Sequence, residues 1–220
     1  MLWPSASELA LSAPLPPGYH YELLDRRQIP VLISALEAWY PGIVVGNASC
    51  HLREDFYVQR VRLEDEPERD FIVILIKQGD RLAGVFSGER DVDGEVLYGR
   101  ICAISPEHRG AHLSRSVPLL EEALGRAMGM GMAYGLATMH YPHMQATFER
   151  MGWRLVGITP GFDRELVAPG VVKRVYEAVY AKVLVAEEGL LRPQARSMTP
   201  AVRALFGILF PGEGPSASSR

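Results

Sequence analysis

The chain has 220 residues, of which 48% are hydrophobic and 22% charged, and its net charge is −3. These values are typical of a water-soluble globular protein with one substantial core, and they provide no clustered basic surface for nucleic acid. The longest uncharged apolar run, Phe71–Ile76, is too short to span a bilayer, so neither nucleic acid nor a membrane is an expected partner.

Cysteine usage and the N-terminus give two further expectations. The two cysteines, Cys50 and Cys102, have no Cys/His spacing that resembles a zinc site, so no metal is expected. The N-terminal segment lacks a basic stretch followed by a long apolar run, which is the pattern of a signal peptide. We therefore expect a cytoplasmic protein.

The first third of the chain predicts one strand and two helices. Residues 1–18 are rich in Pro, Ser and Ala and predict a flexible arm. Tyr19–Leu24 predicts a strand. Apolar residues at helical spacing predict a helix over Gln28–Tyr40, which Pro41-Gly42 ends, and another over Leu52–Val61.

The middle of the chain predicts three strands in series. They are Phe71–Ile76, Arg81–Ser87 and Glu95–Ile104, and turn residues separate them at 79–80 and 91–94. We expect these strands to be antiparallel neighbours. A helix then follows Arg109, and its apolar face carries Leu113, Val117, Leu120, Leu124 and Met128. Pro118 is expected to kink that helix.

The remaining elements complete the predicted fold class. Ala133–Met139, Trp153–Ile158 and Val172–Val185 predict strands, and Gln145–Met151 predicts a short helix closed by Gly152. The order favours an α/β fold with a mixed, largely antiparallel central sheet flanked by helices. Residues 19–185 form the predicted domain.

Residues 186–220 form a predicted C-terminal extension. Thr199-Pro200 begins an amphipathic helix whose apolar stripe either docks on the core or forms a dimer contact, so a homodimer is left open. Residues 212–220 are predicted to be disordered.

The most informative segment runs from Tyr98 to Met130. A strand meets a helix through the turn Pro106-Glu107-His108-Arg109-Gly110, and backbone N–H groups at a helix start have no intrahelical partner. Together with the helix dipole they favour an anion such as a phosphate. The alternative is an ordinary strand–turn–helix connection.

This segment resembles the cofactor motif of the GCN5-related N-acetyltransferase superfamily. Met139–Gln145, followed by Phe148–Trp153, resembles the superfamily's late motif, and the likeness covers Tyr19–Val185. It implies acyl transfer from acetyl-CoA or another acyl-CoA to a small-molecule or protein amine. The implied cofactor-binding residues are Ile101, Cys102, Ala103, Ile104, Arg109, Gly110, Ala111, His112, Leu113, Ser114 and Arg115.

Two departures from that family affect the phosphate-binding turn and the proton donor. His112 and Ser114 replace glycines of the turn, and Phe148 falls where the family often has a proton-donating tyrosine. His140, Tyr141 and His143 follow the strand expected to end near the thioester, and histidine and tyrosine can exchange protons there. Glu95 and Tyr98 lie on the motif strand and could order a water that acts as base.

The resulting hypothesis is an acyl-CoA-dependent N-acyltransferase, in which the amine attacks the thioester directly. The first alternative is a catalytically degenerate acyl-CoA-binding or regulatory module. The second is an interaction protein built around the helix of residues 199–210.

Overall fold

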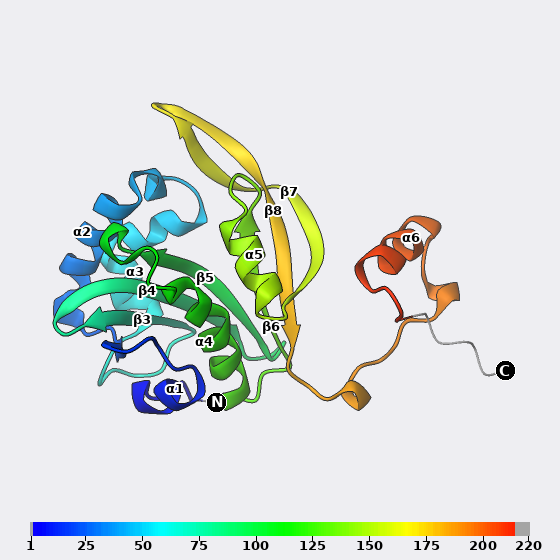
Figure 1. Ribbon diagram of the computed structural model, residues 1–220, viewed down its shortest axis with the longest axis horizontal. Coiled ribbons are helices and arrows are strands. Elements are labelled where there is room, and N and C mark those ends of the chain that lie inside the picture. The colour runs from blue at the N-terminus through cyan, green and yellow to red at the C-terminus, as the bar shows by residue number, and fades with distance from the viewer. Residues whose placement is uncertain (1, 214–220) are drawn as a thin grey trace.

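The computed structural model describes residues 2–213, and they form a mixed eight-stranded sheet with helices on both faces (Figure 1). The strand order is β1-β3-β4-β5-β6-β8-β7, and β2 pairs with β3. All pairs are antiparallel except β2–β3 and β5–β6. The strands are β1 (Tyr19–Leu23), β2 (Val61–Arg62), β3 (Phe71–Gln78), β4 (Arg81–Asp91), β5 (Val96–Ile104), β6 (Met132–Thr138), β7 (Arg154–Ala168) and β8 (Val171–Val183). The predicted fold class is confirmed.

Two apolar cores lie on opposite faces of this sheet. Successive side chains of β3 alternate between them, with Val73 and Leu75 on one face and Ile72 and Ile74 on the other. This is why β3 reads as a continuous apolar run rather than an alternating one. Helices α2 (Ile29–Trp39) and α3 (Glu54–Arg60) cover the first face, and α1 (Ala6–Ser12), α4 (Leu113–Ala127) and α5 (His143–Arg150) cover the second.

The prediction of a flexible arm at residues 1–18 is wrong for most of that segment. Ser5 and Glu8 form a reciprocal capping box that starts α1. Leu9 and Ala13 are then buried in the core, and the Trp3 indole N–H donates to the Arg69 carbonyl at 2.8 Å. Burial of these apolar side chains fixes a segment whose composition alone suggests a loop.

Helix α4 continues through Pro118. Every residue of its predicted apolar face is buried. Since proline removes only one backbone donor, the burial of this long face outweighs the local loss.

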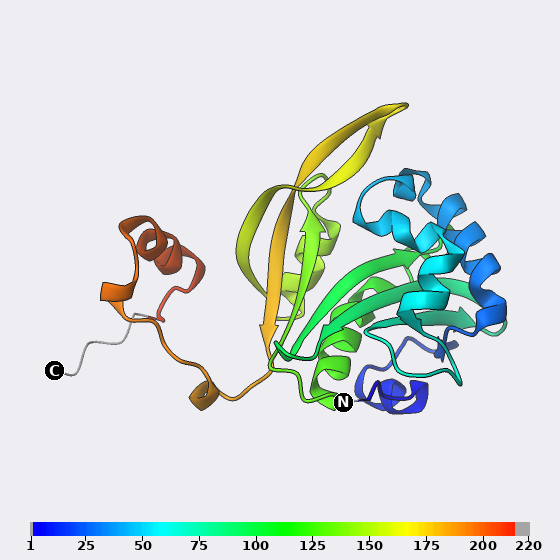
Figure 2. The same cartoon turned by 180° about the vertical axis from the view of Figure 1, so that it is seen from behind.

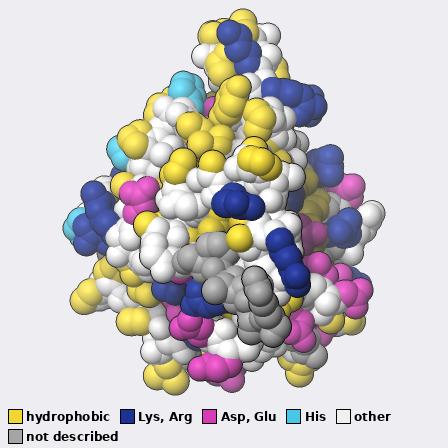
Figure 3. Space-filling view, turned by 90° about the vertical axis from the view of Figure 1, so that its right-hand side faces the viewer, with side chains coloured by type: hydrophobic (Ala, Val, Ile, Leu, Met, Phe, Trp, Pro, Cys, Tyr) yellow, Lys and Arg dark blue, Asp and Glu magenta, His cyan; other side chains and the backbone are white. Residues whose placement is uncertain are grey.

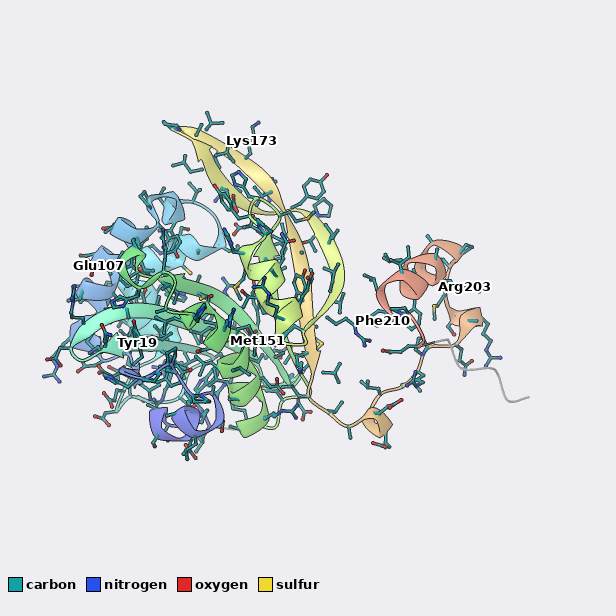
Figure 4. The ribbon with its side chains drawn as sticks, in the orientation of Figure 1. Tyr19, Glu107, Met151, Lys173, Arg203 and Phe210 are labelled. Carbon is teal, nitrogen blue, oxygen red and sulfur yellow. The ribbon has the colours of Figure 1, made fainter. Side chains whose placement is uncertain are left out.

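Strands β7 and β8 form a hairpin that is longer than its sequence suggests. The predicted strand Trp153–Ile158 covers only the first part of β7, and the register shifts between Thr159 and Asp163. The hairpin rises beyond α5 and leans toward the short 3-10 segments η2 (Pro41–Val44) and η3 (Asn47–Leu52) (Figures 1 and 2). Lys173 lies near its tip (Figure 4).

The C-terminal segment carries α6 (Pro200–Leu209), which stands apart from the body of the molecule (Figures 1 and 2). Phe210 lies on the side nearer the sheet (Figure 4), and the Arg154 guanidinium is 5.3 Å from its ring centre. Of the predicted stripe, Val202 and Leu205 are exposed, whereas Phe206, Leu209 and Phe210 are half-buried. Hydrophobic side chains interspersed with basic ones are visible on this side of the molecule (Figure 3). The predicted disordered tail extends beyond residue 213, and residues 214–220 lie outside the described residues.

No helix within residues 2–213 combines the length and apolar character needed to cross a membrane.

Candidate active site

The parallel strands β5 and β6 pair over only four residues and then diverge. Their register runs from Val96 opposite Met132 to Gly99 opposite Gly135. Beyond these two glycines, β5 continues beside β4 while β6 continues beside β8. The sheet therefore opens into a V, and we call the level of Gly99 and Gly135 its apex.

A cavity of about 650 Å³ lies at this opening. Its walls come from the end of α2 with η2 and η3, from β5 and β6, and from the β7–β8 hairpin. The outer walls meet where the Asn47 N–H donates to Asp163 Oδ1 at 2.8 Å. Gly46 has a φ of +82°, and a Cβ there would lie 2.4 Å from the Arg164 carbonyl oxygen, so this contact requires glycine.

Side chains on both faces pack closely around the apex. Tyr98 and Tyr134 stack with ring centres 4.6 Å apart on the cavity side. On the other face, a Cβ at Gly99 would lie 2.7 Å from Glu121 Oε1, and one at Gly135 would lie 2.7 Å from the Phe148 ring. The two glycines thus admit Glu121 and Phe148 beneath the strands.

Arg100 is the extra residue of a β-bulge next to the apex. Ser87 pairs with Ile101 and Gly88 with Gly99, which leaves Arg100 without a partner in the ladder. Its guanidinium lies 3.4 Å from Glu89 and 5.0 Å from the centre of the Tyr98 ring. The bulge places a cation on the cavity wall, where Glu89 partly neutralises it.

Glu177 is a residue of this site that the sequence analysis missed. It lies on β8 between Thr138 of β6 and Thr159 of β7, and only 6% of it is exposed. Its carboxyl accepts no hydrogen bond from any described residue and lines the cavity. Burial raises the pKa of Glu177 to about 7, and the nearby charges of Glu165 and Asp163 contribute. The sequence feature that could have identified this residue is a glutamate within the mostly apolar run Val175–Val183.

The three predicted residues that follow β6 do not form one cluster. His140 and Tyr141 line the cavity, and His140 Nδ1 lies 3.2 Å from Glu165 Oε2. His143 is exposed at the start of α5 and does not line the cavity. Tyr98 lines it, whereas Glu95 lies exposed before β5 and outside it. Glu95 and His143 are therefore not placed to touch a group bound in this cavity.

The start of α4 leaves a row of backbone donors free. The N–H groups of Gly110, His112, Leu113 and Ser114 donate to no group of the described chain. Gly110 and His112 have positive φ, as in backbone turns that bind anions, and the Ala111 N–H between them donates to the His108 carbonyl oxygen at 3.2 Å. Glu107 marks the preceding turn in Figure 4. Leu113 is buried in the core, so only its backbone can serve a ligand, while Arg115 is exposed.

Strand β5 and the turn that follows it supply the remaining predicted cofactor residues. Ile101, Cys102, Ala103 and Arg109 line the cavity, and Ala111 lies half-buried in the turn before α4. Ile104 is bonded to the hydroxyl of Tyr40, through its N–H at 3.3 Å and its carbonyl oxygen at 3.2 Å. The predicted binding residues thus run from the apex of the V to the start of α4.

Solved structures share the fold of this protein, whereas the comparisons by sequence found no match. No protein-family model matches the chain, and no curated protein matches it by sequence. Ribosomal-protein-S18-alanine N-acetyltransferase from Escherichia coli superposes with a TM-score of 0.59 at 11% identity, over 79% of this chain and 99% of that one. A variant of spermidine N-acetyltransferase from Vibrio cholerae gives 0.60 at 11% identity, over 77% and 95%. The chain has the GCN5-related N-acetyltransferase fold.

A third structure with this N-acetyltransferase fold was solved with its ligand. A protein from Salmonella typhimurium, described as an acetyltransferase and solved with its cofactor acetyl-CoA, gives a TM-score of 0.54 at 12% identity, over 79% of this chain and 97% of that one. Because the identities are this low, the likeness establishes the fold of this protein, and its chemistry must be argued from its own residues.

Proposed function

We propose that this protein is an acyl-CoA-dependent N-acyltransferase that uses the cavity at the V of the sheet. The observation that carries the proposal is the position of the cavity. On one side of the cavity, the edge of β5 leads to four free backbone amides at the start of α4. On the other side lies the buried carboxyl of Glu177, whose pKa is about 7. A transferase of this type needs an anion site, an extended channel and a base, and these three features supply them.

The residues at the start of α4 fit an acyl-CoA. The amides of Gly110, His112, Leu113 and Ser114 would hold the diphosphate, since they are unpaired and lie at the positive end of a helix dipole. The free edge of β5 near Cys102 would pair with amides of the pantetheine arm, as an extended peptide pairs with a sheet edge. When bound, the carrier supplies an activated acyl group as a thioester.

Glu177 is the proposed general base. An amine acceptor reaches the cavity as an ammonium ion, and it must lose a proton before its lone pair can attack. A carboxyl with a pKa near 7 can accept that proton, directly or through one water, and remain a useful base at neutral pH. The carboxylates of Glu165 and Asp163 favour the approach of a cation to this wall of the cavity.

Two phenols line the cavity and can protonate the departing thiolate. Burial raises the pKa of the Tyr98 hydroxyl, so it stays protonated at neutral pH. Tyr141 is more exposed and lies beside His140, with ring centres 4.3 Å apart. Phe148 cannot take this role, because it has no donor and is packed against Trp153 and Tyr180. We therefore assign the acid to Tyr98 or Tyr141.

Calorimetry with acetyl-CoA, combined with a thiol-release assay over a panel of amines, tests the proposal. We expect binding of acetyl-CoA, and thiol release with at least one amine that falls sharply in Glu177→Gln. The separate substitutions Tyr98→Phe and Tyr141→Phe identify the acid. A chain that binds no acyl-CoA would contradict the proposal.

A catalytically degenerate acyl-CoA-binding module is the second candidate, and the buried Phe148 is the observation that favours it. Tight CoA binding without thiol release from any amine would support this candidate. Measurable turnover that depends on Glu177 would exclude it.

A further inference from the structure

Tyr40 makes a contact that the proposed reaction does not need. It is the first residue after α2, and its hydroxyl donates to the Ile104 carbonyl oxygen at 3.2 Å and accepts from the Ile104 N–H at 3.3 Å. One side chain thus occupies both backbone groups of a single β5 residue.

The two backbone groups of Ile104 belong to the free edge of β5. The neighbouring Ser105 N–H donates to the Ala83 carbonyl at 2.9 Å, which shows that alternate residues of this segment turn toward β4. Ile104 therefore turns toward the opening of the V, as does Cys102 two residues earlier. These are the groups to which an extended amide-containing arm would pair.

Arg109 holds Tyr40 in this position. Its guanidinium carbon lies 5.2 Å from the centre of the Tyr40 ring, and its Nη2 lies 3.5 Å from the Trp39 carbonyl oxygen. Cation–π attraction and this hydrogen bond tie the end of α2 to the turn before α4. We call the contacts of Tyr40 with Ile104 and Arg109 the Tyr40 latch.

We propose that the Tyr40 latch competes with the acyl carrier for the edge of β5, so that the carrier binds only when Tyr40 leaves Ile104. This inference rests on the proposed function. Its consequence is a coupling between two ligands, because Trp39, Tyr40 and Ile43 also line the cavity that would receive the amine. Release of Tyr40 from Ile104 therefore changes a wall of that cavity as well as the edge of β5.

The variant Tyr40→Phe tests the latch by measuring the Kd of CoA in calorimetry. Loss of the two hydrogen bonds raises the population of the binding-competent state, and CoA is expected to bind about fivefold more tightly. Tyr176→Phe is the matched control, because Tyr176 is an exposed tyrosine of β8 and its hydroxyl bonds to no described residue. It should leave the Kd unchanged.

Hydrogen exchange of the wild-type protein gives a second readout. The amides of Tyr40 and Ile43 donate to the carbonyls of Leu36 and Tyr40. Added CoA should speed their exchange if the latch opens, and added protection there would show that it stays closed. Unchanged or weaker CoA binding by Tyr40→Phe would overturn the latch while leaving the proposed function intact. Failure of both the wild type and the variant to bind CoA would overturn the proposed function as well.

Discussion

Glu177 shows how neighbouring groups change the acid–base properties of a single residue. An isolated glutamate has an ordinary pKa of 4.5, and at neutral pH it is a weak base. Burial within three paired strands removes water from the carboxyl, and the charges of Glu165 and Asp163 disfavour its ionised form further. A glutamate at an exposed position of a strand would be ionised at neutral pH and would be hydrated by solvent.

The pH dependence of turnover tests this environment. For the wild type, kcat/KM should rise with pH and level off above about 7, because only the ionised Glu177 can accept a proton. Glu177→Gln should lose this limb and reduce kcat by about 100-fold. Glu165→Gln should keep the limb but move it to lower pH, because removal of this neighbouring charge lowers the pKa of Glu177. A Glu177→Gln variant that retains the limb would show that another group is the base.

The same pKa shift predicts a pH-dependent stability. Between pH 4.5 and about 7 the folded state holds the Glu177 proton while the unfolded state has released it. The free energy of unfolding contributed by this group therefore falls as pH rises through that range, and it is constant above it. Glu177→Gln should consequently be stabilised relative to wild type more at pH 8 than at pH 5. Urea unfolding at both values measures the difference, and an equal difference would contradict the assignment.

At the scale of elements, the apex of the V depends on two glycines. Gly99 and Gly135 face each other across β5 and β6, and they leave room for Glu121 and Phe148 beneath the sheet. Burial raises the pKa of Glu121 well above its ordinary value, so this carboxyl is accommodated in its neutral form. Close packing here determines where the two strands separate.

Gly99→Ala should therefore destabilise the protein. The added Cβ would lie 2.7 Å from Glu121 Oε1, and Glu121 is 1% exposed, so its carboxyl has little space to move. We expect a loss of about 1–3 kcal/mol in the free energy of unfolding, measured with urea. Gly157→Ala is the control, because it also lies in a strand and its Cβ would meet nothing within 4 Å. An equal loss of unfolding free energy in the two variants would show that the destabilisation comes from the strand conformation and not from contact with Glu121.

At the scale of the whole molecule, residues 2–185 form the body and the C-terminal segment is an appendage. Its ties to the body include the contacts of Arg154 with Phe210 and Glu213. Exposed contacts of this kind contribute little to stability.

Truncation after Ala186 should therefore leave the melting temperature and CoA binding of the body unchanged. The solution mass of both forms, measured by light scattering, reports whether the exposed stripe of α6 joins two copies. A truncated chain that unfolds at a lower temperature would show that the appendage stabilises the body.

The sequence by itself determined the order of most elements from Tyr19 onward and the free backbone amides before α4. Periodicity identified β3, β4 and the buried face of α4, and the turn at Arg109-Gly110 indicated free amides before a helix. These signals are local, since each depends on residues close together in the chain.

The opening between β5 and β6 and the burial of Glu177, on which the proposed catalytic role rests, were decided only by the tertiary structure, because both depend on contacts between distant strands. Trp3 and Leu9 were likewise missed, because only the folded core shows what buries them. Electrostatic environment and packing are properties of the assembled sheet, and no short stretch of this chain encodes them alone.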